Sequence, residues 1–110
     1  MKKKYCFDID GVICKTIGNN YKNSKPILKA INKINKLYEE GNYIIIFTAR
    51  FMGRSKENKK IAKKKGLKIT QTQLKKWGVL YHKLEFGKPS FDLVIDDKSL
   101  FFKKNWHNLI

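Results

Sequence analysis

The sequence is poor in arginine, in acidic residues and in cysteine, and each shortage narrows what the chain can be. Of its 25 basic residues only Arg50 and Arg54 are arginine, and nine acidic residues leave a net charge of +16. Cys6 and Cys14 form no C-x-x-C pair and suggest no disulfide framework, so reduced thiols in a cytoplasmic protein are expected. No apolar run is long enough to cross a membrane, so no membrane-spanning segment is expected.

The length and composition predict one globular domain, residues 1–110. The chain is 42% hydrophobic and 13% aromatic, which is too rich for a disordered segment. Its positive charge is expected to attract phosphates, nucleic acid or acidic polymers. The abundance of lysine, asparagine and isoleucine throughout leaves a compositional bias as the alternative explanation.

Hydrophobic spacing predicts strands and helices in alternation. A strand at 5–7 precedes a loop or short hairpin over 12–24. Ser24 is expected to cap a helix that has Pro26 in its first turn and ends at Gly41. The apolar run 43–47 predicts a strand buried on both faces. The remaining predicted elements are a helix from Ser55 to Lys65 stopped by Gly66, a helix or turn over 70–77, a short third strand over 79–86, a fourth strand over 91–95, and a final helix over 98–106.

This order of elements predicts a three-layer α/β fold with a mainly parallel sheet. Polar residues follow each predicted strand, and ligands bind beyond the carboxyl ends of such strands. Asp8 and Asp10 follow the first strand, and their mutual repulsion calls for a cation such as Mg²⁺. The others are Thr48 and Arg50 after the second strand, Lys88 after the third, and Asp96 and Asp97 after the fourth. Together they suit a phosphoryl group, whose transfer needs charge neutralisation and alignment.

Both arginines follow the second strand, where we expect the rim of the site. A planar guanidinium recognises phosphate or carboxylate oxygens better than an ammonium does. Arg50 and Arg54 are therefore expected to contact the substrate together with Ala49. His82 and His107 are expected to be structural or exposed.

The motifs Asp8-Ile9-Asp10-Gly11-Val12, Phe47-Thr48-Ala49-Arg50, Gly87-Lys88-Pro89 and Asp96-Asp97 occur in the order found in the haloacid dehalogenase (HAD) superfamily. The chain resembles these Mg²⁺-dependent phosphohydrolases over nearly its whole length. The resemblance implies a Rossmann-like HAD core. Because the first gap between motifs, 12–24, is too short for an inserted domain and the second is filled by predicted core helices, it also implies a capless member.

The resemblance also implies a role for each matched residue. Asp8 would be the nucleophile that forms an aspartyl-phosphate, and Asp10 would be the general acid and base. Thr48 would bind phosphoryl oxygens, and Lys88 would keep Asp8 ionised and offset phosphate charge. Asp8, Asp10 through its backbone carbonyl, Asp96 and Asp97 would hold Mg²⁺ or its waters.

The expected reaction is hydrolysis of a small phosphorylated metabolite such as a sugar, polyol or amino-alcohol phosphate. The short length and the Thr-Ala-Arg and Gly-Lys-Pro pieces are similar to phosphatases of capsule or surface-polysaccharide biosynthesis. An uncovered site would admit large substrates or be roofed by a neighbouring subunit of a homo-oligomer. Two alternatives stay open: a phosphatase acting on nucleotides or polynucleotide ends, and a non-catalytic basic binding module on the same scaffold.

Overall fold

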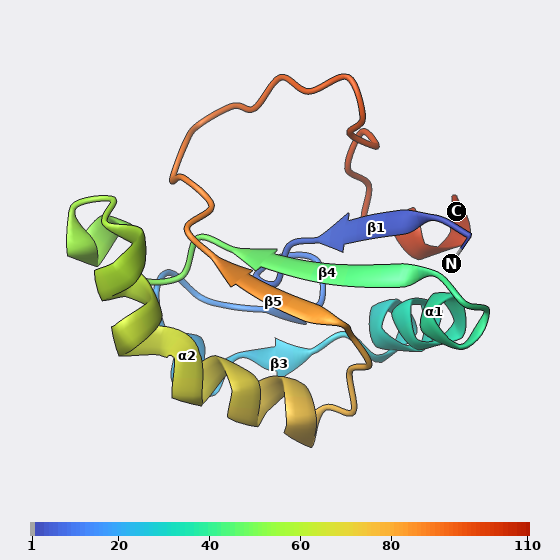
Figure 1. Ribbon diagram of the computed structural model, residues 1–110, viewed down its shortest axis with the longest axis horizontal. Coiled ribbons are helices and arrows are strands. Elements are labelled where there is room, and N and C mark those ends of the chain that lie inside the picture. Colours follow the sequence, from blue (N-terminus) through green and yellow to red (C-terminus); the bar gives the residue numbers. More distant parts are fainter. Residues whose placement is uncertain (1) are drawn as a thin grey trace.

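The computed structural model describes residues 2–110, which form a small α/β unit (Figure 1). Three parallel strands make its central sheet in the order β1-β4-β5, and a separate antiparallel pair joins β2 to β3. The elements in chain order are β1 (Lys4–Phe7), β2 (Cys14–Lys15), η1 (Tyr21–Asn23), β3 (Lys25–Pro26), α1 (Leu28–Glu39), β4 (Tyr43–Thr48), η2 (Gly53–Ser55), α2 (Lys59–Lys76), β5 (Lys83–Phe86) and η3 (Trp106–Asn108).

The core lies on one face of the sheet. Side chains alternate across a strand, and in β4 Ile44, Ile46 and Thr48 are buried whereas Tyr43, Ile45 and Phe47 are half-buried. Figure 1 shows α1 and α2 on the same side of the sheet. Trp106 packs on Phe7 with ring centroids 5.3 Å apart. The predicted α/β class and parallel sheet are therefore confirmed, with no cap domain in residues 2–110, whereas the described chain supplies only one helical layer.

The helix boundaries differ from three of the predictions. Ser24 does not cap α1, because its hydroxyl bonds to Thr16 and Arg50 and Pro26 belongs to β3. Gly66 does not stop a helix, because α2 runs through it as one element. The cap of α2 is Asn58, whose side chain accepts from the Ile61 N–H at 3.1 Å, in place of the predicted Ser55.

The predicted fourth strand, 91–95, and the predicted final helix, 98–106, are wrong. Residues 87–105, here called the C-terminal arm, contain no helix or strand, and η3 follows them. Figure 1 shows this arm arching away from the sheet and returning beside β1. Only residues 87–90 separate β5 from the predicted strand, whereas a parallel strand in the same sheet needs a crossover of about a dozen residues. Residues 91–95 therefore have the apolar pattern of a strand, but too few residues precede them for the chain to return to the start of a parallel strand.

Two further features belong to the fold alone. His82 is structural, since its Nδ1 accepts from the Ile44 N–H at 3.0 Å and its ring stacks on Tyr38 and Tyr43. Among residues 2–110 no helix is both long and apolar enough to cross a membrane.

Candidate functional site

The carboxyl ends of the three parallel strands bring Asp8 and Lys88 together. Asp8 directly follows β1, and Lys88 comes two residues after β5. The Lys88 Nζ donates to Asp8 Oδ2 at 3.1 Å, across 80 residues of sequence. The Lys88 N–H also donates to the Thr48 carbonyl at 3.1 Å, which fixes the lysine backbone against the end of β4. The predicted meeting of these segments is thus observed.

Asp8 is held at both oxygens and still reaches solvent. Its Oδ1 accepts from the Ile9 N–H at 2.8 Å while Oδ2 accepts from Lys88. The Asp8 side chain is 33% exposed, and that of Lys88 is 23% exposed. A carboxylate that is oriented, charge-paired and open to an incoming group has the geometry that a nucleophile needs.

Thr48 ends β4 in the interior beside this pair. It is fully buried, and its Oγ1 accepts from the Arg50 N–H at 3.0 Å. A hydroxyl that accepts one bond retains its own hydrogen for a second partner. Ala49, which follows it, is half-buried.

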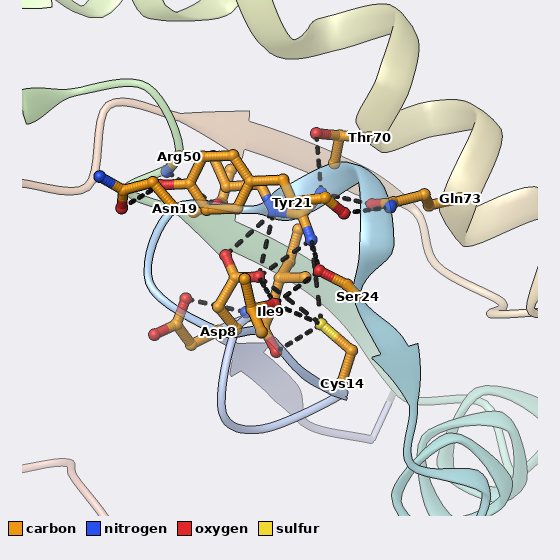
Figure 2. A network of polar contacts seen from close by, with 12 residues as sticks. Asp8, Ile9, Cys14, Asn19, Tyr21, Ser24, Arg50, Thr70 and Gln73 are labelled. Carbon is orange, nitrogen blue, oxygen red and sulfur yellow. Dashed lines mark hydrogen bonds and ion pairs between the residues drawn. The ribbon is translucent and has the colours of Figure 1, made fainter. Parts of the chain in front are cut away.

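Arg50 does not lie on an exposed rim, as the sequence had suggested. It is 1% exposed, and its guanidinium forms a two-point pair with Asp10, Nε to Oδ2 and Nη2 to Oδ1, both at 2.9 Å. Figure 2 shows Ser24, Thr70 and Gln73 around the same guanidinium. Its Nη1 donates to Gln73 Oε1 at 2.6 Å and to Thr70 Oγ1 at 3.3 Å.

Asp10 is bound from a second side by Thr16. The Thr16 hydroxyl donates to Asp10 Oδ1 at 2.5 Å and lies 2.6 Å from the Ser24 hydroxyl. We call Asp10, Thr16, Ser24, Arg50, Thr70 and Gln73 the Arg50 network. It ties the turn after β1 to β4 and α2. Thr16, Thr70 and Gln73 carry no motif, so sequence reasoning did not single them out. Ser24 was expected only as a helix cap, whereas the rarity of arginine did mark Arg50.

Arg54 is exposed, as expected, but it is tied to the neighbouring loop. Its Nη2 donates to the Asn19 carbonyl at 2.6 Å, and its guanidinium lies 4.9 Å from the Phe51 ring centroid. The loop after β4 also holds Phe51, Lys56 and Glu57 at positive φ, which is costly for non-glycine residues. This loop flanks the Arg50 network without presenting a free guanidinium.

Burial raises the pKa of the two thiols that lie near these carboxylates. Desolvation raises the pKa of Cys14, the nearby Asp10 charge raises it too, and the hydrogen bond to Thr16 opposes them. Desolvation also raises the pKa of Cys6, which Lys88 lowers in part. Neither thiol is therefore set up as a nucleophile at neutral pH.

Asp96 and Asp97 stand apart from the other predicted site residues. Both are exposed in the C-terminal arm, where Asp96 Oδ1 accepts from the Lys98 N–H at 2.9 Å. Within residues 2–110 no three His, Cys, Asp or Glu side chains cluster closely enough to hold a metal ion. A single copy therefore does not assemble the expected ligand set for Mg²⁺.

Comparison with known proteins supports the fold. No family model matches the chain, and no curated protein sequence matches it. The chain is similar to the crystal structure of an MCSG target from Vibrio cholerae, with a TM-score of 0.87 and 27% sequence identity. The alignment covers 98% of this chain and 89% of that chain, so it extends over the C-terminal arm. The two proteins therefore share a fold, and the match assigns no activity to this chain.

Proposed function

We propose that the protein is a HAD-type phosphomonoesterase in which Asp8 is the nucleophile. The observation that carries the proposal is the Asp8–Lys88 pair at the carboxyl edge of the parallel sheet, with Thr48 ending the adjacent strand. Two residues 80 positions apart meet there, which composition alone does not explain.

The proposed reaction proceeds in two steps. An Asp8 carboxylate oxygen forms a bond to phosphorus while the bond to the ester oxygen breaks, and the departing alcohol takes up a proton. Water then hydrolyses the aspartyl-phosphate, which releases phosphate and restores the carboxylate. Lys88 offsets the phosphoryl charge, and Thr48 is the proposed hydroxyl donor to a phosphoryl oxygen, although in the structure its side chain is fully buried. Asp10 is the proposed proton donor and acceptor, although in the structure Arg50 holds both of its oxygens.

Dependence on Mg²⁺ belongs to this proposal. Asp8 and Asp10 offer oxygen ligands of the kind that Mg²⁺ prefers. The additional carboxylates expected from Asp96 and Asp97 are not in place within one copy, so we derive no step through the ion. The three-layer HAD core is also part of this proposal, because residues 2–110 supply only one helical layer.

The proposed substrate is a small phosphate monoester, with surface-polysaccharide precursors as the class that the motifs suggest. The site has no cap over it in residues 2–110, and Arg54 and Asn19 join the loops that follow β4 and β2. The net charge of +16 favours a nucleic-acid end as a second candidate. Oligonucleotide binding that collapses with added salt while turnover is unchanged would mark that charge as unspecific attraction.

The test is release of phosphate from an aryl phosphate, with and without Mg²⁺, followed by a panel of sugar and polyol phosphates. Asp8→Asn is expected to lower kcat by about 10³-fold or more, since it removes the group that forms the covalent bond. Glu40→Gln removes the same charge from an exposed position and should leave kcat unchanged. Equal rates for wild type and Asp8→Asn would remove Asp8 from the mechanism.

A further inference from the structure

The C-terminal arm exposes a dense set of large apolar side chains. Ile95 is 93% exposed, Leu93 79% and Phe101 84%. Phe91, Val94, Leu100 and Phe102 are about half exposed as well. A soluble monomer seldom presents so many contiguous apolar residues, and such patches mark interaction surfaces.

The sheet offers a matching unfilled position along β1. This strand is an edge of the sheet, with β4 on one side only. The Lys3 carbonyl accepts from the Tyr43 N–H, so by alternation the backbone groups of Lys4 and Cys6 face the free edge. No backbone hydrogen bond joins residues 89–105 to this edge in the described chain.

The sheet face opposite the helices is also open. Its half-buried Tyr43 and Ile45 floor a hollow of about 470 Å³ rimmed by Lys2, Lys3, Lys4 and Lys83. Parallel sheets occur almost always with both faces covered. Residues 91–97 of the arm carry charge opposite to this rim, because Asp92, Asp96 and Asp97 are three of the nine acidic residues and no basic residue lies among them; lysines follow only from Lys98 on.

The arm cannot fill the β1 position of its own copy as a parallel strand. It leaves β5 at the carboxyl edge of the sheet, and residues 87–90 are too few to return to the amino edge. An antiparallel course would carry Asp96 and Asp97 away from Asp8. A second copy, approaching from outside, has no such constraint.

The surface area of the single copy supports a missing partner. The described chain exposes 7846 Å². A compact monomer of this mass exposes about 6,300 Å² by the usual scaling, and the difference of about 1,500 Å² exceeds the roughly 800 Å² that each partner buries in a standard interface.

We propose that two copies exchange their C-terminal arms. Phe91–Ile95 of one copy adds as a parallel strand to the free edge of β1 in the other, and the apolar residues after it cover the open face. Asp96 then follows the added strand as Asp8 follows β1, which brings the second copy's Asp96 and Asp97 beside the Asp8–Lys88 pair. The exchange itself stands on the fold; that it completes a phosphatase site rests on the proposed function.

Two measurements test the exchange without any activity. Light scattering coupled to size exclusion should give twice the mass of the chain over a wide range of concentrations. Cysteine placed singly at Leu93, Val94 and Ile95 should form an intermolecular disulfide with the exposed Cys6 at one or more positions, since paired strands lie within disulfide reach. Lys64→Cys, on the exposed face of α2, is the control and should give no such product.

Mixing inactive variants tests whether the site is shared. Asp8→Asn and the double variant Asp96→Asn/Asp97→Asn are each expected to be inactive as homodimers. After mixed refolding, about a quarter of the sites combine an intact core from one copy with an intact arm from the other, so about that share of activity returns.

The outcomes separate the two proposals. A monomer by mass, a dimer with no arm cross-link at any of the three positions, or a disulfide formed within one chain would each overturn the exchange. Cross-linked dimers without activity on any phosphate ester would uphold the exchange and overturn the phosphatase. An active wild type whose mixed variants recover nothing would uphold the phosphatase and overturn the shared site.

Discussion

Arg50 shows why this lysine-rich chain uses arginine in its interior. Its planar guanidinium binds both oxygens of Asp10 while its remaining hydrogens reach Thr70 and Gln73. The Tyr21 ring lies over it at 4.9 Å. A lysine ammonium is a compact charge with three donors and cannot match this flat, two-point geometry. The Arg50 network therefore orients the carboxylate two residues beyond Asp8 and anchors the turn after β1.

We predict that Arg50→Lys lowers the free energy of unfolding by about 3 kcal/mol, because a buried charge pair loses its geometry. Urea unfolding followed by circular dichroism measures this change. Arg54→Lys is the matched control on an exposed side chain and should cost no more than about 0.5 kcal/mol. Equal losses for the two variants would show that the Arg50 network does not hold the fold.

The two thiols give a second prediction at this scale. Because burial raises the pKa of Cys14, the unfolded chain releases that proton at lower pH than the folded one. The stability that this thiol contributes is present below its unfolded pKa and is lost as pH rises through the folded value. The urea midpoint should thus fall between pH 7.5 and about 9.5, and fall less in Cys14→Ala.

Thiol labelling tests the burial of Cys14 independently of the urea measurements. A maleimide should modify Cys6, which is exposed in a single copy, before Cys14, and more rapidly as pH rises. Cys14 should react only after unfolding. Labelling of Cys14 in the native protein at neutral pH would contradict its burial.

At the scale of elements, α2 depends on a glycine in its middle. A Cβ built on Gly66 would lie 2.5 Å from Phe51 Cδ2 and 3.0 Å from Phe86 Cε2. The glycine is therefore a packing site where the helix approaches β5 and the loop after β4. Helix propensity alone would mark it as a stop, which is why the sequence suggested two helices instead of one.

Gly66→Ala is expected to destabilise the protein by about 1–3 kcal/mol, although alanine is the better helix former by about 1 kcal/mol. Thermal unfolding measures the balance. Lys64→Ala, in the same helix but exposed, should be neutral or slightly stabilising. A more stable Gly66→Ala would mean that Phe51 turns aside without cost.

The sequence predicted the elements that follow from local hydrophobic spacing and the contacts that follow from the shared edge of parallel strands. The apolar run of β4, the spacing of α1 and the Asp8–Lys88 contact were all predicted correctly. The Arg50–Asp10 pair was missed because no sequence pattern indicates that the Arg50 side chain is buried instead of lying on the rim of the site. Phe91–Ile95 has the composition of a strand, but whether it forms one depends on a path and a neighbour that the sequence pattern does not describe. The predicted metal site depended on that strand.

At the scale of the whole molecule, charge repulsion opposes folding. The chain has 25 basic and nine acidic residues, and four ion pairs occur among residues 2–110. Lys60, Lys64 and Lys68 are exposed along one side of α2 at four-residue spacing, where like charges repel. A compact state with this much charge of one sign is destabilised by its own field.

Raising the salt concentration from about 20 to about 300 mM is therefore expected to raise Tm by several degrees. Salt screens the repulsion among exposed lysines strongly, whereas it screens the attraction within the partly buried pairs Arg50–Asp10 and Lys88–Asp8 less. Lys64→Glu should raise Tm at low salt, since it turns two repulsive contacts on α2 into attractive ones, and it should reduce the salt effect. Lys64→Gln should have about half of this effect, because it removes repulsion without adding attraction. Measurements at one fixed protein concentration separate this effect from dimer formation, which would make Tm rise with concentration. A Tm that falls with salt would show that the few ion pairs, rather than the excess of lysine, dominate the electrostatics of the fold.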